Sequence, residues 1–441
     1  MSPLSGKLAF PPLRRSCLYF YIRSGTPASL ERRSRACTGL QVQSNQIKDW
    51  LIVDRRLLFL ALGMFALGTD SFVVAGVLPQ IAHGFGVSIG AAGQMTTIYA
   101  LTNGALAPVI AAFASGVSRK RLLLTGLVIF VLANLGTAIA PNFAVAMIMR
   151  AIAGAAAAMF STTAISSAMV IVPRERQGAA IAVVIAGLSI STALGAPLGA
   201  LIGGLSDWRW TMVFVAVLAA ASAAGVGAFL KQIPVLPPVS LSQRLAPLAD
   251  RRVGLTLAST FLFFTAAFTI YTYLSVVFQR VTGGSTAILS GLLVLWGVAG
   301  TVSNVLVGRW VDAIGNRKVL VTMLTLVTVD FILLPWSSAA LWSSIIAIVV
   351  WGFCGWGMLV PQQHRIVGIA PTIAPVVLGL NNSATFLGTT AAGVLGAFGI
   401  DLMGVSNLGF LAAGFGAASL LFAELAGRAI HWTNLRREAT A

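Results

Sequence analysis

The stretch LLFLALGMFALGTDSFVVAGVLPQ, residues 57–80, decides the fold of this chain. Its one charged residue is Asp70. A helix needs about 20 mostly apolar residues to cross the roughly 30 Å hydrocarbon core of a bilayer, so this stretch predicts a transmembrane helix. Comparable stretches recur along the chain and predict twelve spans. They are 57–80, 90–113, 121–140, 143–171, 178–204, 209–230, 253–279, 286–308, 318–336, 338–361, 374–401 and 405–427.

The overall composition points the same way. The 441 residues are 57% hydrophobic and only 9% charged, whereas a soluble domain carries roughly 25% charged residues. So few charges cannot cover the surface of a water-soluble protein of this size. The strands of a membrane barrel would alternate polar and apolar residues, and these segments do not. The sequence therefore predicts an all-α integral membrane protein.

The basic residues are distributed unevenly between the two sides of the predicted spans. On one side of the membrane, the predicted loops contain only two basic residues, Arg209 and Arg280. The loops on the other side contain all the remaining loop Lys and Arg residues. This asymmetry predicts that both termini are cytoplasmic. It also accounts for the net charge of +17 without a nucleic-acid partner, because the charges follow the loops and do not gather on one face. The basic side includes Arg119, Lys120, Arg121, Arg174, Arg176, Lys231, Arg244, Arg251, Arg252, Arg309, Arg317, Lys318, Arg365, Arg428, Arg436 and Arg437.

The chain divides into segments of different character. Residues 1–54 hold no apolar run long enough to span a membrane, and they predict a disordered cytoplasmic segment. A transit peptide, or a true translation start near Val53, stays open as an alternative. Residues 232–252 are rich in proline and predict a cytoplasmic linker. The linker separates a bundle of six helices, 55–231, from a second one, 253–430, and a cytoplasmic tail, 431–441, follows.

The two halves share a loop pattern. Residues 111–121 contain Ala-x3-Ser-x2-Ser followed by the basic run Arg119, Lys120 and Arg121. Residues 308–318 contain Gly-x3-Asp-x2-Gly-Asn-Arg-Lys, and both segments join the second and third spans of their half. Internal repeats of this kind are typical of secondary transporters, whose substrate site lies at the interface between the repeats.

With these features the chain resembles the major facilitator superfamily over residues 55–430. Within it, the chain is similar to the twelve-span drug:proton antiporters, especially the branch with sugar- and chloramphenicol-efflux proteins. The loop signature G-x3-D-x2-G-R-[KR] is matched with one extra residue, Asn316, before the arginine. The matching residues are Gly308, Asp312, Gly315, Arg317 and Lys318.

The resemblance implies two six-helix bundles around a central cavity, and export of a small molecule in exchange for protons. It also implies that the loop stabilises the outward-facing state. An ordinary basic loop is the alternative, and the first-half copy lacks the acid. Span five carries Gly195, Pro197 and Gly199, which resemble the antiporter signature of the fifth helix. General packing of small residues, which lets helices approach closely, is the alternative there.

Two charged residues lie at similar depth inside the first bundle. A charge in a span is costly and has to find a partner, water or the headgroups. The resemblance implies that Arg150, at the start of span four, takes part in proton coupling. Asp70 is the predicted proton or cationic-substrate site, because burial and a nearby cation shift a carboxylate's proton affinity in opposite directions. A fixed structural pair, or an arginine that extends to the headgroups, is the alternative.

Uncharged polar and aromatic side chains at mid-depth suggest where a substrate would bind. Drug-sized pockets are mostly apolar with few polar groups. Asp330 is predicted as an acid near the membrane interface, and Glu424 with Arg428 as a pair one helical turn apart. The predicted cavity residues are Tyr99, Asn103, Trp296, Asn304, Gln362, Asn381 and Asn382.

Other classes of protein lack their signatures here. The histidines His83, His364 and His431 are in or beside different loops, and no metal site is predicted. The sequence has no GxxxxGK[ST] phosphate loop and no catalytic cluster, so we expect neither an enzyme nor ATP-driven transport. The prediction is a monomeric, multi-pass exporter of drug-like compounds in a bacterial inner membrane. It needs no cofactor because the proton gradient supplies the energy. A sugar or metabolite exporter is the near alternative, and a passive facilitator or importer is the remote one.

Overall fold

The computed structural model describes residues 54–113, 116–231 and 240–440, without the side chains of Arg174 and of residues 434–440. Residues Arg55–Ala441 form one compact unit. The prediction for the N-terminal segment falls on residues 1–53 and lies outside the described residues, as does most of the proline-rich part of the linker.

The described ranges contain twelve helical segments that are long and apolar enough to cross a membrane, and they contain no strand. This confirms the predicted fold class and number of spans. The predicted short connection between spans nine and ten is present, because α16 ends at Ser337 and α17 begins at Leu341. The first six spans are α3 (Arg55–Val73), α5 (Ile89–Phe113), α6 (Arg119–Ala138), α7 (Phe143–Ile171), α8 (Gln177–Ile190) with α9 (Ala196–Leu205), and α10 (Trp208–Phe229). The second six are α12 (Arg251–Tyr271), α15 (Thr286–Ile314), α16 (Asn316–Ser337), α17 (Leu341–Gly357) with α18 (Leu359–Ile369), α19 (Ala374–Met403) and α20 (Leu408–Thr440).

Many spans begin at a short polar residue that caps the helix. Ser118, Asn142, Asp207, Asp250 and Ser285 each accept a hydrogen bond from a backbone N–H in the first turn that follows. The first turn of a helix has N–H groups without an intrahelical partner, and such a side chain satisfies one of them. These caps fix where α6, α7, α10, α12 and α15 start.

Several spans are interrupted where the sequence predicted continuous helices. Span five changes to a π-helical turn at Ser191–Gly195, directly before Pro197 in the first turn of α9. Proline has no N–H to donate and crowds the preceding turn, so the helix accommodates it with a local change of pitch. Span one ends in a 3-10 turn, and α4 (Leu78–Phe85), with Pro79 in its first turn, is a separate helix beyond it.

Glycines bring spans one and five into close contact. A Cβ at Gly187 would lie 2.0 Å from the carbonyl oxygen of Ala61, and one at Gly195 would lie 2.0 Å from the Thr69 hydroxyl. No larger residue fits at either position without moving the helices apart. Close approach through small residues is a common way to pack helices in a bilayer, where the hydrophobic effect does not drive helices together.

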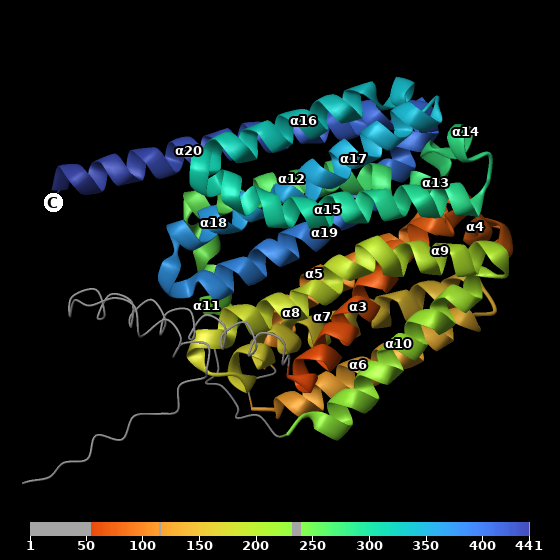
Figure 1. Ribbon diagram of the computed structural model, residues 1–441, viewed down its shortest axis with the longest axis horizontal. Helices are drawn as coiled ribbons and strands as arrows, with labels where there is room; N and C mark the ends of the chain where they lie inside the picture. Colours follow the sequence, from red (N-terminus) through yellow and green to blue (C-terminus); the bar gives the residue numbers. More distant parts are fainter. Residues whose placement is uncertain (1–53, 114–115, 232–239, 441) are drawn as a thin grey trace, which may run out of the picture. The chain divides into compact units, whose positions relative to one another are not determined.

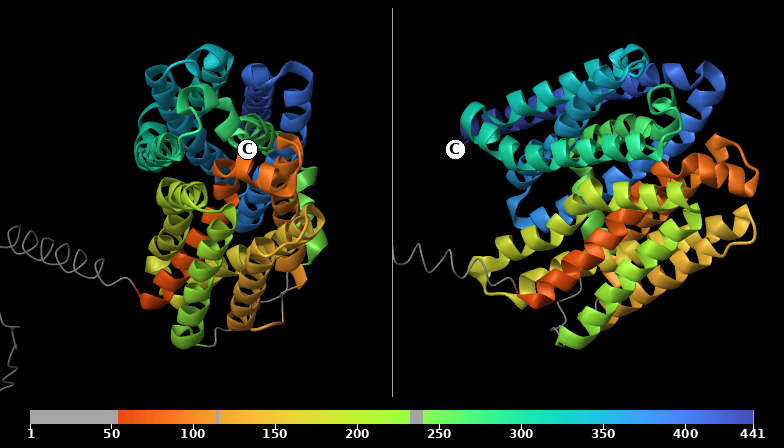
Figure 2. Two further views of the ribbon diagram at one scale, coloured as in Figure 1. Left: turned by 90° about the vertical axis from the view of Figure 1, so that its right-hand side faces the viewer. Right: turned by 45° about the vertical axis from the view of Figure 1, so that its right-hand side comes forward.

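The spans form two bundles of six, one from each half of the chain (Figure 1). The bundles meet where α5 packs against α19, and where α15 packs against α9 and the π-helical turn. Both figures show the two sets of helices converging toward the end that carries α4 and α13 (Leu274–Val277) and spreading apart toward the opposite end (Figures 1 and 2). We call these the α4 end and the α11 end, after the short linker helix α11 (Leu241–Leu245).

The outer surface of the bundles is apolar. Large hydrophobic side chains on several spans are exposed, among them Leu132, Val217, Ile346 and Phe398. Exposed apolar patches of this extent are rare on monomeric soluble proteins. A lipid bilayer is the medium that such a surface requires.

Candidate functional site

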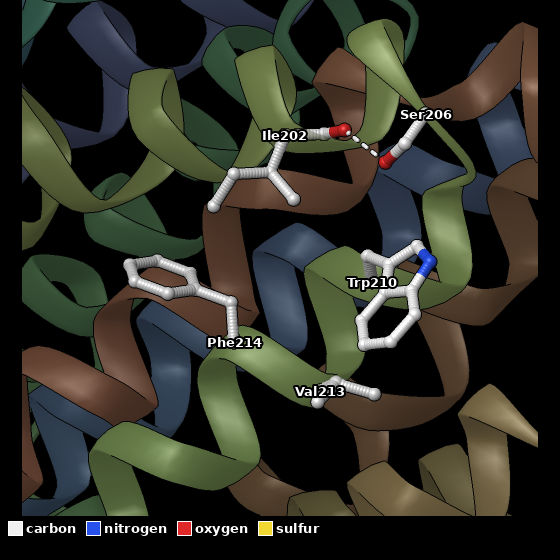
Figure 3. Close-up of a pocket in the computed structure, with 5 residues that line it drawn as sticks. All are labelled: Ile202, Ser206, Trp210, Val213 and Phe214. Carbon is white, nitrogen blue, oxygen red and sulfur yellow. Dashed lines mark hydrogen bonds between the residues drawn. The ribbon is translucent and has the colours of Figure 1, made fainter.

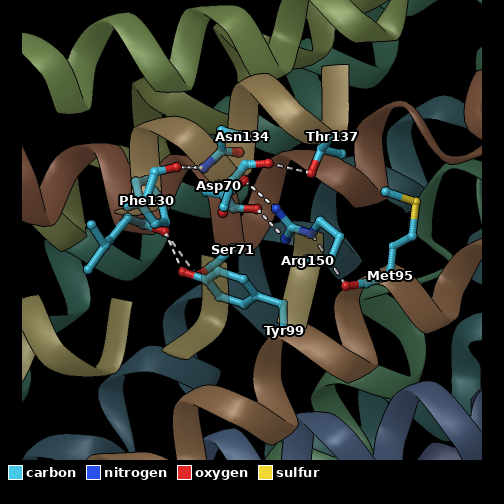
Figure 4. Close-up of polar contacts among 10 residues, drawn as sticks. Asp70, Ser71, Met95, Tyr99, Phe130, Asn134, Thr137 and Arg150 are labelled. Carbon is cyan, nitrogen blue, oxygen red and sulfur yellow. Dashed lines mark hydrogen bonds and ion pairs between the residues drawn. The ribbon is translucent and has the colours of Figure 1, made fainter. Parts of the chain in front are cut away.

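A buried ion pair lies in the middle of the first bundle (Figure 4). Arg150 of α7 places Nη1 2.5 Å from Oδ1 of Asp70 on α3, and both side chains are completely buried. The guanidinium also donates from Nη2 to the backbone carbonyl of Asp70 at 3.4 Å, and from Nε to that of Met95 at 3.4 Å. Three acceptors therefore hold the arginine, which satisfies the requirement for a partner inside the membrane.

An aromatic ring and two polar side chains complete the surroundings of this pair. The guanidinium carbon of Arg150 lies 4.6 Å from the centroid of the Tyr99 ring, which is a cation–π contact. The Tyr99 hydroxyl donates to the Leu67 carbonyl at 3.4 Å. Asn134 and Thr137 of α6 lie beside Asp70 (Figure 4). The site thus draws on spans one to four of a single bundle.

One oxygen of the carboxylate is unused. Oδ2 of Asp70 is buried and has no hydrogen-bond partner within the described residues, while Oδ1 contacts Arg150. A buried acceptor without a partner is costly, and native structures rarely leave one without a reason. An ionised carboxylate only accepts hydrogen bonds, whereas a protonated one also donates. The free oxygen is therefore a position at which a proton can be held beside the arginine.

The opposite face of α3 contacts the other bundle through Phe72. Its ring centroid lies 5.6 Å from that of Tyr271, 6.0 Å from that of Trp296 and 5.9 Å from that of Trp356. The Tyr271 hydroxyl also donates to the Phe72 carbonyl at 3.1 Å. Side chains two positions apart on a helix point in nearly opposite directions, so α3 presents Asp70 to its own bundle and Phe72 to the second. We call Phe72 and these three side chains the aromatic contact.

Sequence reasoning missed this contact, although Trp296 was among the predicted cavity residues. The detectable signal was the pair Phe268 and Tyr271, three positions apart on span seven and therefore on one helix face. The Phe268 ring lies 6.1 Å from Phe72 and 5.4 Å from Tyr271. Nothing in the sequence indicated that Phe72 would be their partner.

The remaining predicted cavity residues lie in different places. Asn103 is buried on α5, one turn from Tyr99. In the second bundle, Thr260 donates to Oδ1 of Asn381 at 2.8 Å, and Gln362 donates to the Thr260 hydroxyl at 3.1 Å. These two amides therefore join spans seven, ten and eleven to one another. Asn382 is exposed on α19 and Asn304 is half-buried on α15.

The loop motif of the second half forms an ion pair that differs from the predicted one. Arg317, at the start of α16, donates from Nε and Nη2 to the two carboxylate oxygens of Glu424 on α20. The prediction that Glu424 pairs with Arg428 is therefore wrong in its choice of partner. Two N–H groups held in a planar fork match a carboxylate better than a single contact along one helix. Arg365 of α18 lies nearby and donates to the Ala423 carbonyl at 3.0 Å.

The other residues of the two loop motifs differ in their contacts and exposure. Gly315 has a φ of +89°, which only glycine adopts readily, and it separates α15 from α16. In the first-half loop, Arg119 donates to the Ser166 carbonyl, and Nζ of Lys120 donates to that of Gly227 at 2.7 Å. These contacts join the start of α6 to α7 and α10. Exposed residues of the two motifs are Arg121, Asp312 and Lys318, while Gly308 is half-buried.

Asp330 is another acid inside the predicted spans. It is half-buried on α16 and forms no ion pair within the ranges that the structure describes. Its surroundings therefore differ from those of Asp70, which has a cation in contact. Among the described residues there is also no group of three His, Cys, Asp or Glu side chains that could hold a metal ion.

The chain is similar in sequence to proteins of a known family. Residues 60–393 match the model of the Major Facilitator Superfamily. The chain is 30% identical over 359 residues to the uncharacterized MFS-type transporter YbcL of Bacillus subtilis, a match that covers 81% of this chain and 92% of that protein. It is 30% identical over 362 residues to the inner membrane transport protein YdhP of Escherichia coli, with 81% and 93% covered.

A third relative has a more specific name. The probable sugar efflux transporter of Mannheimia succiniciproducens is 27% identical over 368 residues, with 83% of this chain and 92% of that protein covered. The match to the family model spans most of the chain, and the twelve helices have the family's number and type of span. The chain is a multi-pass membrane transporter that belongs to the major facilitator superfamily.

Proposed function

We propose that this transporter exports drug-like or other toxic small molecules in exchange for protons, and that Asp70 carries the proton. The buried Asp70–Arg150 pair with its free Oδ2 is the observation that supports this most directly. The alternative role of Asp70, direct binding of a cationic substrate, has less support. The carboxylate already contacts a cation, and it lies on the face of α3 away from Phe72 and the second bundle.

The coupling would run through α3. Protonation of Asp70 removes one charge of the pair and leaves Arg150 with backbone carbonyls and the Tyr99 ring. The attraction that holds α3 against α7 weakens, because a neutral carboxyl and an arginine attract each other far less than two opposite charges. Since α3 also carries Phe72, a shift of this helix alters the aromatic contact between the bundles. In this way, a proton bound on the Asp70 face of α3 changes the contact that Phe72, on the opposite face, makes with the second bundle.

The direction of transport follows from which end of the bundles is closed in this conformation. The basic loops favour the α11 end as the cytoplasmic side, with both termini there. The bundles converge at the α4 end and spread apart toward the α11 end (Figure 1), an arrangement that supports a conformation closed to the outside. Rocking of one bundle on the other would open the α4 end and release substrate. The proton gradient supplies the energy, no cofactor is involved, and a single chain suffices.

A sugar or metabolite exporter is the second candidate. It is favoured by the similarity to a protein named as a probable sugar efflux transporter. Growth of cells with and without the gene, on a panel of toxic compounds and on a panel of sugars and sugar analogues, separates the two substrate classes. A passive facilitator is tested in the same cells, because its transport persists when the proton gradient is collapsed.

The decisive experiment compares two acids in inverted membrane vesicles. Asp70→Asn removes the proposed proton site, and Asp330→Asn removes an acid of the same kind that has no ion-pair partner among the described residues. After a substrate is found with the panels, we expect substrate-dependent proton release to be lost in D70N and retained in D330N. Substrate-driven proton movement of parental size in D70N, with normal amounts of protein in the membrane, would falsify the assigned role.

A second experiment tests the closed α4 end. A Cβ at Gly204, at the α4 end of span five, would lie 2.2 Å from the Thr286 side chain of α15 in the second bundle, whereas one at Gly291 of α15 would meet nothing within 4 Å. We expect Gly204→Ala to shift the protein toward the conformation open at the α4 end, and Gly291→Ala to leave it unchanged. Accessibility of single cysteines at that end to a membrane-impermeant thiol reagent measures the shift. Equal labelling in both variants would contradict this account of the closed end.

A further inference from the structure

Two adjoining shallow cavities, both open to the surface, lie at the α4 end of the first bundle, outside the site described above. The first has a volume of about 480 Å³ and is lined by Ile202, Trp210, Val213 and Phe214 (Figure 3). The second, of about 400 Å³, lies between α4 and the turn that joins α9 to α10. Ser206 lines both, so the cavities meet at that residue.

The two cavities lie at different depths along the spans. Because α9 ends at Leu205 and α10 begins at Trp208, the turn between them marks the boundary of spans five and six. The first cavity is lined by apolar side chains inside those spans, and the second by residues of the turn and of α4. Trp210 is largely exposed at this level, which is typical of tryptophan at a membrane interface. A ligand that fills both cavities has a polar head at the turn and an apolar chain along the spans.

The polar cavity offers hydrogen-bond donors and a positive charge. Trp208 is only 2% exposed, and its Nε1 has no hydrogen-bond partner within the described residues. A Cβ at Gly84 would come within 3.0 Å of this nitrogen, so any larger residue there would crowd the N–H. The guanidinium of Arg209 lies 4.7 Å from the Trp208 ring and lines the same cavity. An anionic oxygen, such as that of a phosphate, satisfies both groups.

The same cavity also offers acceptors and a negative charge. Oε1 of Gln80 is buried and has no hydrogen-bond partner in the described part of the chain. Asp207 is half exposed. Its Oδ1 caps α10 by accepting from the backbone N–H of Arg209 at 2.8 Å, and its Oδ2 forms a loose ion pair with Arg209 Nη1 at 3.7 Å, too long for a hydrogen bond. A cationic group with N–H donors satisfies both acceptors. The cavity is thus complementary to a head group that carries both signs of charge.

We propose that these two cavities together bind a phospholipid with an ethanolamine head group from the leaflet at the α4 end. The phosphate contacts Arg209 and the N–H of Trp208, and the ammonium contacts Asp207 and Gln80. An acyl chain lies along Phe214. A glycerol head group has no cation for Asp207, and a choline head group has the charge but no N–H to donate to Gln80.

Lipid retention by the purified full chain tests this site. The protein in detergent is titrated separately with phosphatidylethanolamine, phosphatidylcholine and phosphatidylglycerol, and the bound lipid is counted by native mass spectrometry. Trp208→Phe keeps an aromatic ring and removes the donor. Trp342→Phe, at an exposed tryptophan of α17 that lines neither cavity, is the matched control. Gln80→Leu is a second variant that removes the buried acceptor alone.

We expect one molecule of phosphatidylethanolamine to bind more tightly than either other lipid. The affinity should fall about ten-fold in W208F and in Q80L, as for the loss of one hydrogen bond, and stay unchanged in W342F. Equal retention of the three lipids, or equal affinity in all variants, overturns the proposal. So does binding of glycerophosphoethanolamine alone as tightly as the whole lipid, because the apolar cavity would then contribute nothing.

Discussion

The two bundles each contain an ion pair between different spans, and the pairs differ sharply in their surroundings. In the first bundle both Asp70 and Arg150 are 0% exposed. In the second, Arg317 is 67% exposed and Glu424 is 25% exposed. The chemistry of the two pairs is the same, a guanidinium against a carboxylate. In the mechanism that we propose, burial lets the first pair couple a proton to helix position, whereas the exposed second pair only joins helix ends.

The physical reason is the dielectric environment. An exposed pair is screened by water and ions, and contributes about 0–1 kcal/mol. A buried pair has lost its hydration, so removal of one partner leaves a charge with no compensation and costs about 3–5 kcal/mol. Each prediction below tests whether this difference between the bundles is as large as burial requires.

Removal of the buried arginine should have the largest effect. Arg150→Met leaves Asp70 without its cation, and we expect the free energy of unfolding to fall by about 3–5 kcal/mol. Arg317→Met is the matched change in the second bundle, with an expected loss of less than about 1 kcal/mol. Denaturant unfolding in mixed micelles measures both. Similar losses in the two variants would remove the basis of the comparison.

Removal of both charges should recover part of that stability. The double variant Asp70→Asn with Arg150→Met has no uncompensated charge, so we expect it to be more stable than R150M by about 2 kcal/mol or more. Its substrate-dependent proton release should nevertheless be absent, because the carboxylate is gone. If the double variant is no more stable than R150M, then cavity formation and not charge dominates the cost at this site.

The Tyr99 ring should contribute less than the ion pair. Tyr99→Leu removes the cation–π contact with Arg150, for an expected loss of about 2 kcal/mol in this desolvated site. Tyr99→Phe keeps the ring and loses only the weak 3.4 Å hydrogen bond to Leu67, so it should stay within about 1 kcal/mol of the parent. Thermal unfolding of both variants in the same detergent compares them. An equal loss in the two would assign the effect to the hydroxyl.

The exposed pair should respond to salt where the buried pair does not. Glu424→Gln removes the negative charge and one of the two oxygens that accept from Arg317, with an expected loss of about 0.5–1 kcal/mol at low ionic strength. Because surface charges are screened within about 8 Å at 0.15 M salt, this loss should shrink as salt is added. The loss in D70N should remain constant across the same series. A salt-independent effect of E424Q would show that the pair is more buried than its 67% and 25% exposures indicate.

A third pair, between the capping residue Asp250 and Arg252 in the first turn of span seven, should give the smallest effect and a pH dependence. The hydrogen bond from Arg252 lowers the pKa of Asp250 below its usual range. A carboxylate with a lowered folded-state pKa stabilises the protein above its unfolded value, about 3.9, and the stabilisation is lost as pH falls through the folded pKa. Asp250→Asn should therefore lower the melting temperature slightly at pH 7. The difference from the parent should vanish well below pH 4, and a difference that grows on acidification would contradict the assignment.

The sequence predicted the spans more reliably than the contacts of individual side chains. Apolar runs identified twelve helices. The connection that was hardest to place, between spans nine and ten, lies between Ser337 and Leu341. Asp70 and Arg150 were recognised because charges inside apolar runs are rare, and their similar depth suggested that they are neighbours. The structure adds that they touch, and that Oδ2 of the aspartate is free.

Other features could not be predicted because they depend on how helices rotate against one another. Nothing local distinguishes Phe72 from other apolar residues of span one, yet it meets the aromatic side chains of the second bundle. Glu424 has Arg428 one turn away on its own helix, but the bidentate partner is Arg317, more than a hundred positions earlier. The predicted roles of the cavity residues and loop motifs stay predictions.

Sequence alone determined that this chain lies in a membrane, how many times it crosses, and which spans carry charge. Those properties follow from the local hydropathy and length of each segment, because lipid requires every crossing segment to satisfy its own backbone. Tertiary structure alone decided which faces of the helices meet, and so placed Asp70 toward its own bundle and Phe72 toward the other. Packing of all the spans together sets those rotations, and no single segment contains that information.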